Sequence, residues 1–284
     1  VRFKKETGIE VREFEVTNAA QREQAMTRFA QRGSQVIVAI GFSQASAVEA
    51  AAKKFPNVKF AIIDGTVNLP NVQSINFREQ ESSFLCGMAA ALASKTGKVG
   101  FVGGMDIPLI RKFACGYAQG VKAVNPDATV VLNMTGTTPS AWNDPVKGSE
   151  LTLAQISQGA DVVYAAAGGT GVGVLQTAAD QGILSIGVDS NQNYLHPGQV
   201  LTSMMKRVDN AVYDAFTAGA DLAPGFNVMG VSNGGVGYAL DENNASLVSA
   251  EMQAAVDQAA ADISSGALSV HDYMSDESCD ALSF

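Results

Sequence analysis

The chain has 284 residues, of which 46% are hydrophobic and 17% are charged, and this length is typical of two lobes of about 100–150 residues each. Its net charge is −9, from 19 Lys and Arg against 28 Asp and Glu. No basic cluster interrupts that balance, which argues against a face that binds the phosphate backbone of nucleic acid. No apolar run approaches the roughly 20 residues that a helix needs to cross a bilayer.

Short apolar, β-branched runs alternate along the chain with segments of helical period. The sequence predicts strands at Val11–Val16, Val36–Ile40, Val58–Ile63, Val72–Phe77, Val99–Val102, Thr129–Asn133, Val162–Ala166, Ile183–Val188, Val200–Met204, Phe226–Val231 and Val236–Leu240. It predicts helices at Ala19–Gln31, Gln44–Phe55, Glu79–Ser94, Leu109–Val124, Val146–Ser157, Val172–Gln181, Asp209–Ala218 and Ser249–Ser264. Strands of four to six apolar residues that alternate with helices indicate an α/β fold whose parallel sheets are covered on both faces.

The alternation starts afresh near Lys98 and predicts a second doubly wound lobe. The expected first lobe comprises residues 1–96 and 206–225, and the second comprises 97–205 and 226–284, with the place of the last segment left open. Val1–Gly8 is typical of the end of a helix with Gly8 as its cap. Because a doubly wound lobe begins with a strand, we expect further residues, including any secretion signal, to precede Val1.

Cysteine and histidine are sparse in this chain. Cys86, Cys115 and Cys279 are widely spaced and form no C-x-x-C motif. Cys86 lies in an apolar stretch and is predicted to be a buried thiol, whereas Cys279 lies in a polar tail and is either exposed or paired. With only His196 and His271, the sequence offers no zinc cluster, and we expect neither a metal nor a cofactor.

The common nucleotide and hydrolase motifs are also missing. Gly169 opens a G-x-G pattern, but Val174 stands where a dinucleotide site needs its third glycine. Gly97-Lys98 is followed by Val99 rather than by Ser or Thr, so it is no phosphate-binding loop. The chain has no Gly-x-Ser-x-Gly elbow for a nucleophilic serine, and we identify no catalytic residue.

Polar residues that directly follow predicted strands are the candidates for binding a ligand, because ligands of parallel α/β sheets lie beyond the carboxyl ends of the strands. Asp64 and Asp189 each end such a strand, and Lys206 follows another. A carboxylate there accepts hydrogen bonds from vicinal hydroxyls or a base N–H, and an ammonium donates them. If they do not bind a ligand, each Asp is a solvated loop residue or a helix cap, and Lys206 is an ordinary surface lysine.

Aromatic residues near the same ends are candidates for stacking on a planar ligand. Trp142, the only tryptophan, stands just before the helix start at Asp144-Pro145, where it can stack on a ring or pack against its own loop. Phe42 follows the strand Val36–Ile40 and is the weaker candidate, because Phe is often a core residue.

Several ordered motifs cover nearly the whole chain: Lys98–Gly104, Met105–Pro108, Phe113–Tyr117, Trp142–Gly148, Ala167–Gly171 and Ile186–Ser190. Together they resemble the motifs of the basic membrane protein family, the purine-nucleoside-binding receptors of bacterial ABC importers. The resemblance implies a type I periplasmic-binding-protein fold, in which two doubly wound lobes are joined by a three-crossover hinge and the ligand lies in the cleft between them.

The resemblance also implies roles for single residues. Trp142 takes the place of one of two aromatics that sandwich the base, and Asp64 falls at an acidic position that hydrogen-bonds the ligand. Gly168 or Gly169 offers backbone groups to the ligand, whereas Asp189 and Lys206 bind the ribose hydroxyls. In the family the first strand and its loop supply an Asn and the opposing aromatic, and these residues would precede Val1.

Taken together, the sequence predicts a non-enzymatic, monomeric receptor outside the cytoplasm, either periplasmic or anchored by a lipid to the outer face of a bacterial cytoplasmic membrane. Its expected partners are a nucleoside and the permease of an ABC importer. One alternative is the ligand-sensing core of a transcription regulator, which would need a helix-turn-helix and a basic face. The other is a nucleoside-processing enzyme, which would need a general base or nucleophile beside the ligand.

Overall fold

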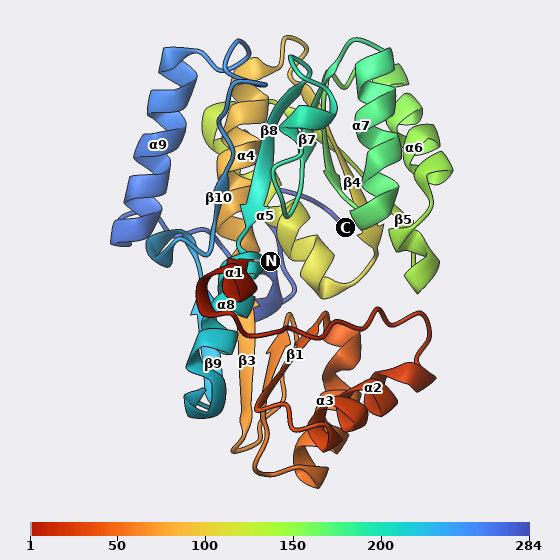
Figure 1. Ribbon diagram of the computed structural model, residues 1–284. Helices are drawn as coiled ribbons and strands as arrows, with labels where there is room; N and C mark the ends of the chain where they lie inside the picture. Colours follow the sequence, from red (N-terminus) through yellow and green to blue (C-terminus); the bar gives the residue numbers. More distant parts are fainter. Residues whose placement is uncertain (1) are drawn as a thin grey trace. The chain divides into compact units, whose positions relative to one another are not determined.

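The structure, a computed structural model, describes residues 2–284 and contains two units, each with its own β-sheet (Figure 1). The first unit comprises the chain up to Phe77 together with Arg207–Met229, and the second comprises Arg78–Lys206 and Gly230–Phe284. The chain therefore passes between the units after Phe77, Lys206 and Met229. The predicted α/β architecture with parallel sheets is confirmed.

The first unit contains a four-stranded, all-parallel sheet in the order β1-β2-β3-β9. The strands are β1 (Val36–Ile40), β2 (Lys59–Ile63), β3 (Val72–Phe77) and β9 (Gly225–Met229). Its helices are α1 (Arg2–Thr7), α2 (Ala20–Gln31), α3 (Ala45–Lys54) and α8 (Val208–Ala218), with short 3-10 turns at η1 (Phe42–Gln44) and η5 (Gly219–Asp221).

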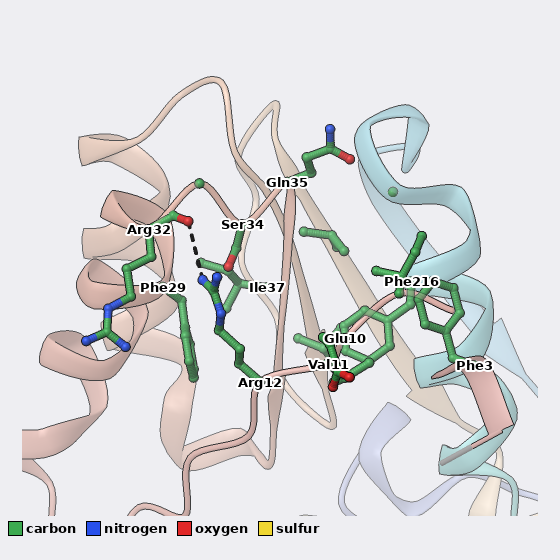
Figure 2. Close-up of a pocket in the computed structure, with 15 residues that line it drawn as sticks. Phe3, Glu10, Val11, Arg12, Phe29, Arg32, Ser34, Gln35, Ile37 and Phe216 are labelled. Atoms are coloured by element: carbon green, nitrogen blue, oxygen red, sulfur yellow. Dashed lines mark hydrogen bonds between the residues drawn. The ribbon is translucent and has the colours of Figure 1, made fainter. Parts of the chain in front are cut away.

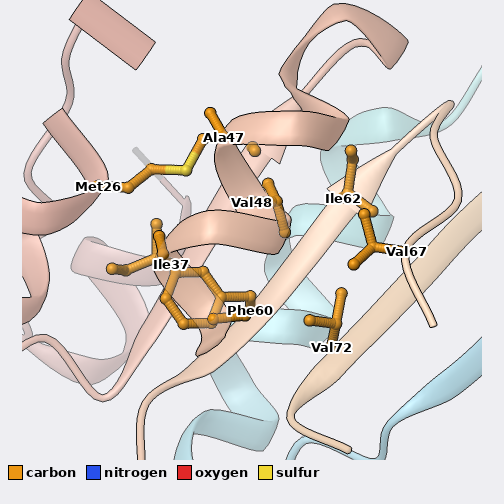
Figure 3. Close-up of a cluster of buried hydrophobic side chains, with 11 residues drawn as sticks. Met26, Ile37, Ala47, Val48, Phe60, Ile62, Val67 and Val72 are labelled. Carbon is orange, nitrogen blue, oxygen red and sulfur yellow. The ribbon is translucent and has the colours of Figure 1, made fainter. Parts of the chain in front are cut away.

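A buried apolar cluster joins α2 and α3 to this sheet (Figure 3). Met26 of α2 and Val48 of α3 pack with Ile37, Phe60 and Ile62 of the strands, and all five are at most 6% exposed. The inward residues of β1 alternate with less buried ones, as expected where side chains of a strand point to opposite faces.

The start of the chain is partly as predicted. Helix α1 ends at Thr7 and is capped by Gly8, which has a positive φ of 72° and donates its N–H to the carbonyl of Lys4 at 2.9 Å. The predicted strand Val11–Val16 is wrong, since residues 8–17 adopt no regular structure and Ile9 and Phe14 are exposed. A strand forms only where another strand pairs with its backbone, and no described strand pairs with this segment.

The second unit contains a six-stranded sheet in the order β10-β8-β7-β6-β4-β5, in which only β10 runs antiparallel. The strands are β4 (Lys98–Met105), β5 (Thr129–Gly136), β6 (Val162–Ala166), β7 (Leu184–Gly187), β8 (Val200–Lys206) and β10 (Val236–Tyr238). The predicted strands of this region are therefore present, with ends that differ by up to three residues.

Helices cover both faces of this sheet (Figure 1). Helices α6 (Pro145–Ser157) and α7 (Gly171–Asp180) lie on one face, and α4 (Glu79–Ala93) and α5 (Pro108–Val124) lie on the other, with α9 (Ala250–Ser265) beside α4. Short 3-10 turns lie at η2 (Pro139–Trp142), η3 (Gly168–Thr170), η4 (Asn193–Leu195), η6 (Val231–Asn233) and η7 (Tyr273–Ser275). The predicted start of α6 is confirmed, because Asp144 Oδ1 accepts a hydrogen bond from the N–H of Lys147 at 2.9 Å.

Helix α4 belongs to the second unit, whereas the sequence analysis placed residues up to 96 in the first lobe. The reason is its unusually close contact with α5. A Cβ at Gly87 would lie 2.1 Å from the backbone O of Tyr117, and a Cβ at Gly120 would lie 2.0 Å from the backbone O of Phe84. These glycines let the two helix backbones touch, so α4 and α5 pack as one layer.

The segment after α9 is fastened to one face of α5. Cys115 and Cys279 form a disulfide, and the free thiol of Cys86 is buried, as predicted. Gln119, one turn after Cys115, donates to the carbonyl of His271 (3.0 Å) and accepts from its N–H (2.9 Å). Cys279, for which the sequence left exposure and pairing open, is thus paired with Cys115.

Candidate functional site

The carboxyl ends of the strands of the second unit carry most of the predicted ligand residues. Trp142 ends η2 after β5, Gly168 and Gly169 open η3 after β6, Asp189 follows β7, and Lys206 ends β8. Because β5, β4, β6, β7 and β8 are neighbours that run in parallel, one edge of one sheet presents all of these residues.

Trp142 lies over two glycines. A Cβ at Gly104 of β4 would lie 2.3 Å from Trp142 Cζ3, and one at Gly168 would lie 3.5 Å from Cε3. The indole therefore rests on bare backbone at Gly104, a position where any other side chain would displace it. Trp142 is half-buried, so part of the ring remains open to solvent.

Two threonines hold the turn that carries Trp142. The carbonyl of Ala141 accepts hydrogen bonds from Thr135 Oγ1 (2.9 Å) and Thr170 Oγ1 (2.8 Å). Thr170 Oγ1 also accepts from the N–H of Asp144 at 2.7 Å. These bonds tie η2 to β5 on one side and to η3 on the other, so the backbone of Trp142 is fixed while its ring is half-exposed.

Asp189 adopts a left-handed backbone conformation with φ of 65°, which Asp tolerates better than most residues. Its carbonyl accepts from the N–H of Lys206 at 2.8 Å, and the residue is exposed to solvent. Desolvation by surrounding protein atoms raises the pKa of its carboxyl, while the Lys206 ammonium lowers that pKa and Glu79 raises it. Desolvation prevails, so the pKa of the Asp189 carboxyl lies above its ordinary value, within the field of two buried charges.

Lys206 is buried, contrary to the surface alternative, with its side chain only 5% exposed. Its Nζ lies 2.9 Å from Glu79 Oε1, and Glu79 Oε2 lies 2.9 Å from Nζ of Lys112. Burial by itself raises the pKa of the Glu79 carboxyl, but the two ammonium groups outweigh it, and the pKa lies below its ordinary value. Glu79 is therefore ionised at neutral pH and pairs with both lysines.

The candidates of the first unit also follow its strands. Asp64 follows β2 with a left-handed φ of 61°, is half-buried, and donates its backbone N–H to the carbonyl of Ile75 at 2.9 Å. Phe42 opens η1 after β1 and is 39% exposed. A Cβ at Gly65 would lie 3.6 Å from the Cα of Phe42, so the structure brings Phe42 close to the Asp64-Gly65 turn.

The first unit also contains a cavity of about 360 Å³ that no predicted ligand residue lines (Figure 2). It is lined by Ile37 of β1, by Phe29 and Phe216, and by Val11 of the irregular N-terminal segment. Arg12 also lines it and donates from Nη1 to the carbonyl of Arg32 at 3.3 Å. This cavity is separate from the strand ends that carry Asp64 and Phe42.

Sequence reasoning missed Glu79 and Gly104. Glu79 is the first residue of α4, where an acidic residue is ordinary because it complements the helix dipole, so nothing in the sequence marks it as buried. Gly104 belongs to the segment Lys98–Gly104 on which the family resemblance rests, but only the structure shows that it lies under Trp142. Within residues 2–284 no group of His, Cys, Asp or Glu is arranged to hold a metal ion.

The fold and the strand-end site define a class of protein. Two parallel-sheet α/β units between which the chain passes three times, with candidate binding residues at strand ends, are the type I periplasmic-binding-protein architecture of solute-binding proteins. In the part of the chain that the structure describes, no helix has both the length and the apolar character needed to span a bilayer.

Comparison with known proteins identifies the family. The Bmp family, described as ABC transporter substrate-binding protein PnrA-like, matches residues 1–270. The chain is 36% identical over 262 residues to the ABC transporter nucleoside-binding protein BmpA of Lactococcus lactis subsp. cremoris, covering 84% of this chain and 72% of the relative. It is 35% identical over 220 residues to basic membrane protein D of Borreliella burgdorferi, covering 74% of this chain and 63% of that relative. The chain belongs to the Bmp family of ABC-transporter substrate-binding proteins.

Solved structures agree with this assignment. A solute-binding protein of an ABC transporter system from Aeropyrum pernix superposes with a TM-score of 0.82 at 28% identity, covering 94% of this chain and 85% of that one. A transcriptional activator of the comK gene from Bacillus halodurans has the same TM-score of 0.82 at 24% identity, covering 95% of this chain and 93% of that one, and shows the fold alone. Membership of this family implies a small-molecule ligand, a transporter permease as partner and a place of action outside the cytoplasm.

Proposed function

We propose that this chain binds a purine nucleoside, without converting it chemically, and delivers it to the permease of an ABC importer. The observation that carries the proposal is the half-exposed indole of Trp142, which lies on Gly104 at the carboxyl edge of the second sheet. A ring that rests on backbone and is only half-buried is suited to stack on a planar base.

Polar groups at the same edge of this sheet match a ribose. Asp189 presents a carboxylate that accepts hydrogen bonds from vicinal hydroxyls, and Lys206 supplies an ammonium that donates them. Gly168 or Gly169 would offer backbone groups, because both stand beside Trp142 without a side chain. The name of the Lactococcus lactis relative, a nucleoside-binding protein, supports the same ligand class.

In the first unit, Asp64 and Phe42 are proposed as further ligand contacts. Both follow strands at the carboxyl edge of their own sheet, and they lie near each other. By the family resemblance Asp64 would accept a hydrogen bond from the ligand, and Phe42 would add apolar contact.

We also propose that the protein acts as a monomer in the periplasm, or anchored by a lipid on the outer face of the cytoplasmic membrane. The disulfide between Cys115 and Cys279 supports an oxidising compartment.

Thermal unfolding of protein stripped of ligand by unfolding and refolding tests the proposal. The panel holds inosine, guanosine, adenosine, uridine, adenine and ribose, each in large excess. A ligand at about 1,000 times its Kd adds roughly 4 kcal/mol of stability and raises the midpoint by several degrees. We expect purine nucleosides to shift the midpoint and ribose to leave it unchanged, and the absence of a shift with every nucleoside would refute the ligand class.

Substitutions of the candidate site residues test whether the ligand-induced shift of the thermal midpoint arises from binding at this site. Trp142→Ala and Asp189→Ala should each weaken binding and leave the midpoint of the ligand-free protein nearly unchanged, because Asp189 is exposed and Trp142 is only half-buried. Trp142→Phe is the matched control, since it retains an aromatic ring and should retain most of the affinity. A large loss of ligand-free stability in the alanine variants would instead make these residues structural.

A further inference from the structure

Helix α4 begins with a buried carboxylate that joins two lysines in the second unit. Glu79 is 1% exposed, and each of its carboxylate oxygens lies 2.9 Å from one ammonium, Oε1 from Lys206 and Oε2 from Lys112. Nζ of Lys112 in turn lies 3.6 Å from Oδ2 of Asp272. The charges therefore alternate in a row from Asp272 through Lys112 and Glu79 to Lys206.

This row ends at the strand edge that carries the candidate site. Helix α4 packs beside β8, so its first residue, Glu79, meets Lys206 where that strand ends. Asp189 stands next to this point, because its carbonyl accepts from the N–H of Lys206 at 2.8 Å. The Lys206 ammonium pairs with Glu79 and also acts electrostatically on the Asp189 carboxyl, whose pKa it lowers.

We propose that Glu79 is a positioning residue that holds the Lys206 ammonium in the orientation in which it donates to the ribose hydroxyls of a nucleoside. The inference rests on the proposed function, since it takes Lys206 as a ligand contact. A lysine side chain is long and flexible, and a buried ammonium needs a counter-ion. Without Glu79 the ammonium turns to Asp189, and the donor and the acceptor for the ribose then neutralise each other.

Glu81 provides a matched control in the same first turn of α4. It too is a buried glutamate, but its Oε2 accepts from the N–H of Val231 at 2.8 Å and its Oε1 pairs with Arg78 at 3.2 Å. Glu79→Gln and Glu81→Gln thus make the same chemical change in the same helical turn, and only the first removes the charge paired with Lys206.

Titration calorimetry with inosine and with 2′,3′-dideoxyinosine separates positioning from a structural role. Removing a hydrogen bond to a charged group costs about tenfold in affinity or more. We therefore expect Glu79→Gln to lose at least about tenfold for inosine and less than about threefold for the dideoxynucleoside. Glu81→Gln should preserve the ratio of the two affinities, and Glu79→Asp, which retains the charge on a shorter side chain, should restore part of that ratio.

Each result has a defined meaning. An equal loss for both ligands in Glu79→Gln, or no loss for inosine, overturns the inference while the proposed function stands. If the wild-type protein binds neither ligand, the proposed function itself fails and the inference fails with it. Should Glu79→Gln not fold, Glu79→Asp decides alone, and an unchanged ratio in that variant overturns the inference. In a Lys206→Met background, Glu79→Gln should cause no further change in the ratio.

Discussion

Replacing Gly104 with alanine tests whether the position of the indole controls nucleoside binding. The new Cβ would lie 2.3 Å from Trp142 Cζ3 and 2.5 Å from Cε3. Non-bonded carbon atoms prefer a separation of about 3.5 Å or more, so the ring must move outward by roughly 1 Å. Gly104 has no positive φ, and its backbone therefore accepts alanine without strain. The substitution acts on the ring and not on the strand.

The expected magnitude follows from the stacking energy. Stacking of a base on an aromatic side chain contributes about 1–3 kcal/mol, which corresponds to about 5- to 140-fold in Kd. We expect Gly104→Ala to weaken binding of inosine within this range. The free energy of unfolding of the ligand-free protein should change by less than about 1 kcal/mol, because Trp142 is half-buried and can move toward solvent.

Intrinsic fluorescence provides the assay, since Trp142 is the only tryptophan of the chain. Its emission reports the movement of the ring, and its change on titration with inosine gives the Kd. Gly136→Ala is the control, because a Cβ there would meet only Ala141 Cβ at an ordinary 3.5 Å. An affinity within twofold of wild type, together with a shifted emission of Gly104→Ala, would refute the role of the indole in binding.

Three further predictions concern stability. Gly120→Ala should destabilise the ligand-free protein by about 1–3 kcal/mol in urea unfolding, because the new Cβ would lie 2.0 Å from the backbone O of Phe84. Reduction of the disulfide between Cys115 and Cys279 should cost about 2–4 kcal/mol and lower the thermal midpoint in the presence of a reductant. The Glu79 carboxyl has a depressed folded-state pKa, so its stabilising effect is full above the ordinary value near 4.5 and is lost as the pH falls through the folded-state pKa. The stability difference between wild type and Glu79→Gln should therefore shrink below pH 4.5, as urea midpoints measured across that range would show.

Each of these predictions has a control and a contrary outcome. Gly237→Ala, whose Cβ would meet nothing within 4 Å, should leave stability unchanged, and an equal loss there would contradict the packing argument for Gly120. A thermal midpoint that does not respond to the reductant would show that the tail contributes nothing through its disulfide. A stability difference at Glu79 that stays constant with pH would show that its charge does not stabilise the fold.

The alternation of strands and helices was predictable from the sequence because it depends on local patterns. Strands such as Val36–Ile40 and Val162–Ala166 have the predicted ends, since turn residues on both sides of an apolar β-branched run define where the strand begins and ends. Val11–Val16, in which Arg12, Glu13 and Glu15 interrupt the apolar residues, forms no strand. Strand formation also requires a neighbouring backbone, which the pattern of one segment does not contain.

The candidate site was predictable only in part. The order of strands and helices along the chain shows which residues follow each strand. The placement of Trp142 and Asp189 at one edge of the sheet could therefore be predicted from the alternation of strands and helices. The burial of Lys206 and its ion pair with Glu79 depend on how α4 packs against β8, which is a contact between distant segments. The pairing of Cys115 with Cys279, 164 residues apart in the sequence, is long-range for the same reason.

The order in which the first unit acquires its strands has a consequence for synthesis on the ribosome. Its strand β9 pairs with β3 in parallel, with Gln73 opposite Gly225, yet residues 78–206 of the second unit lie between the two segments of the first. At the usual 5–20 residues per second, translation of that insertion takes roughly 6–26 s. During this interval the nascent first unit exposes the edge of β3 without its partner strand. Folding of the first unit can therefore finish only after most of the second has been made.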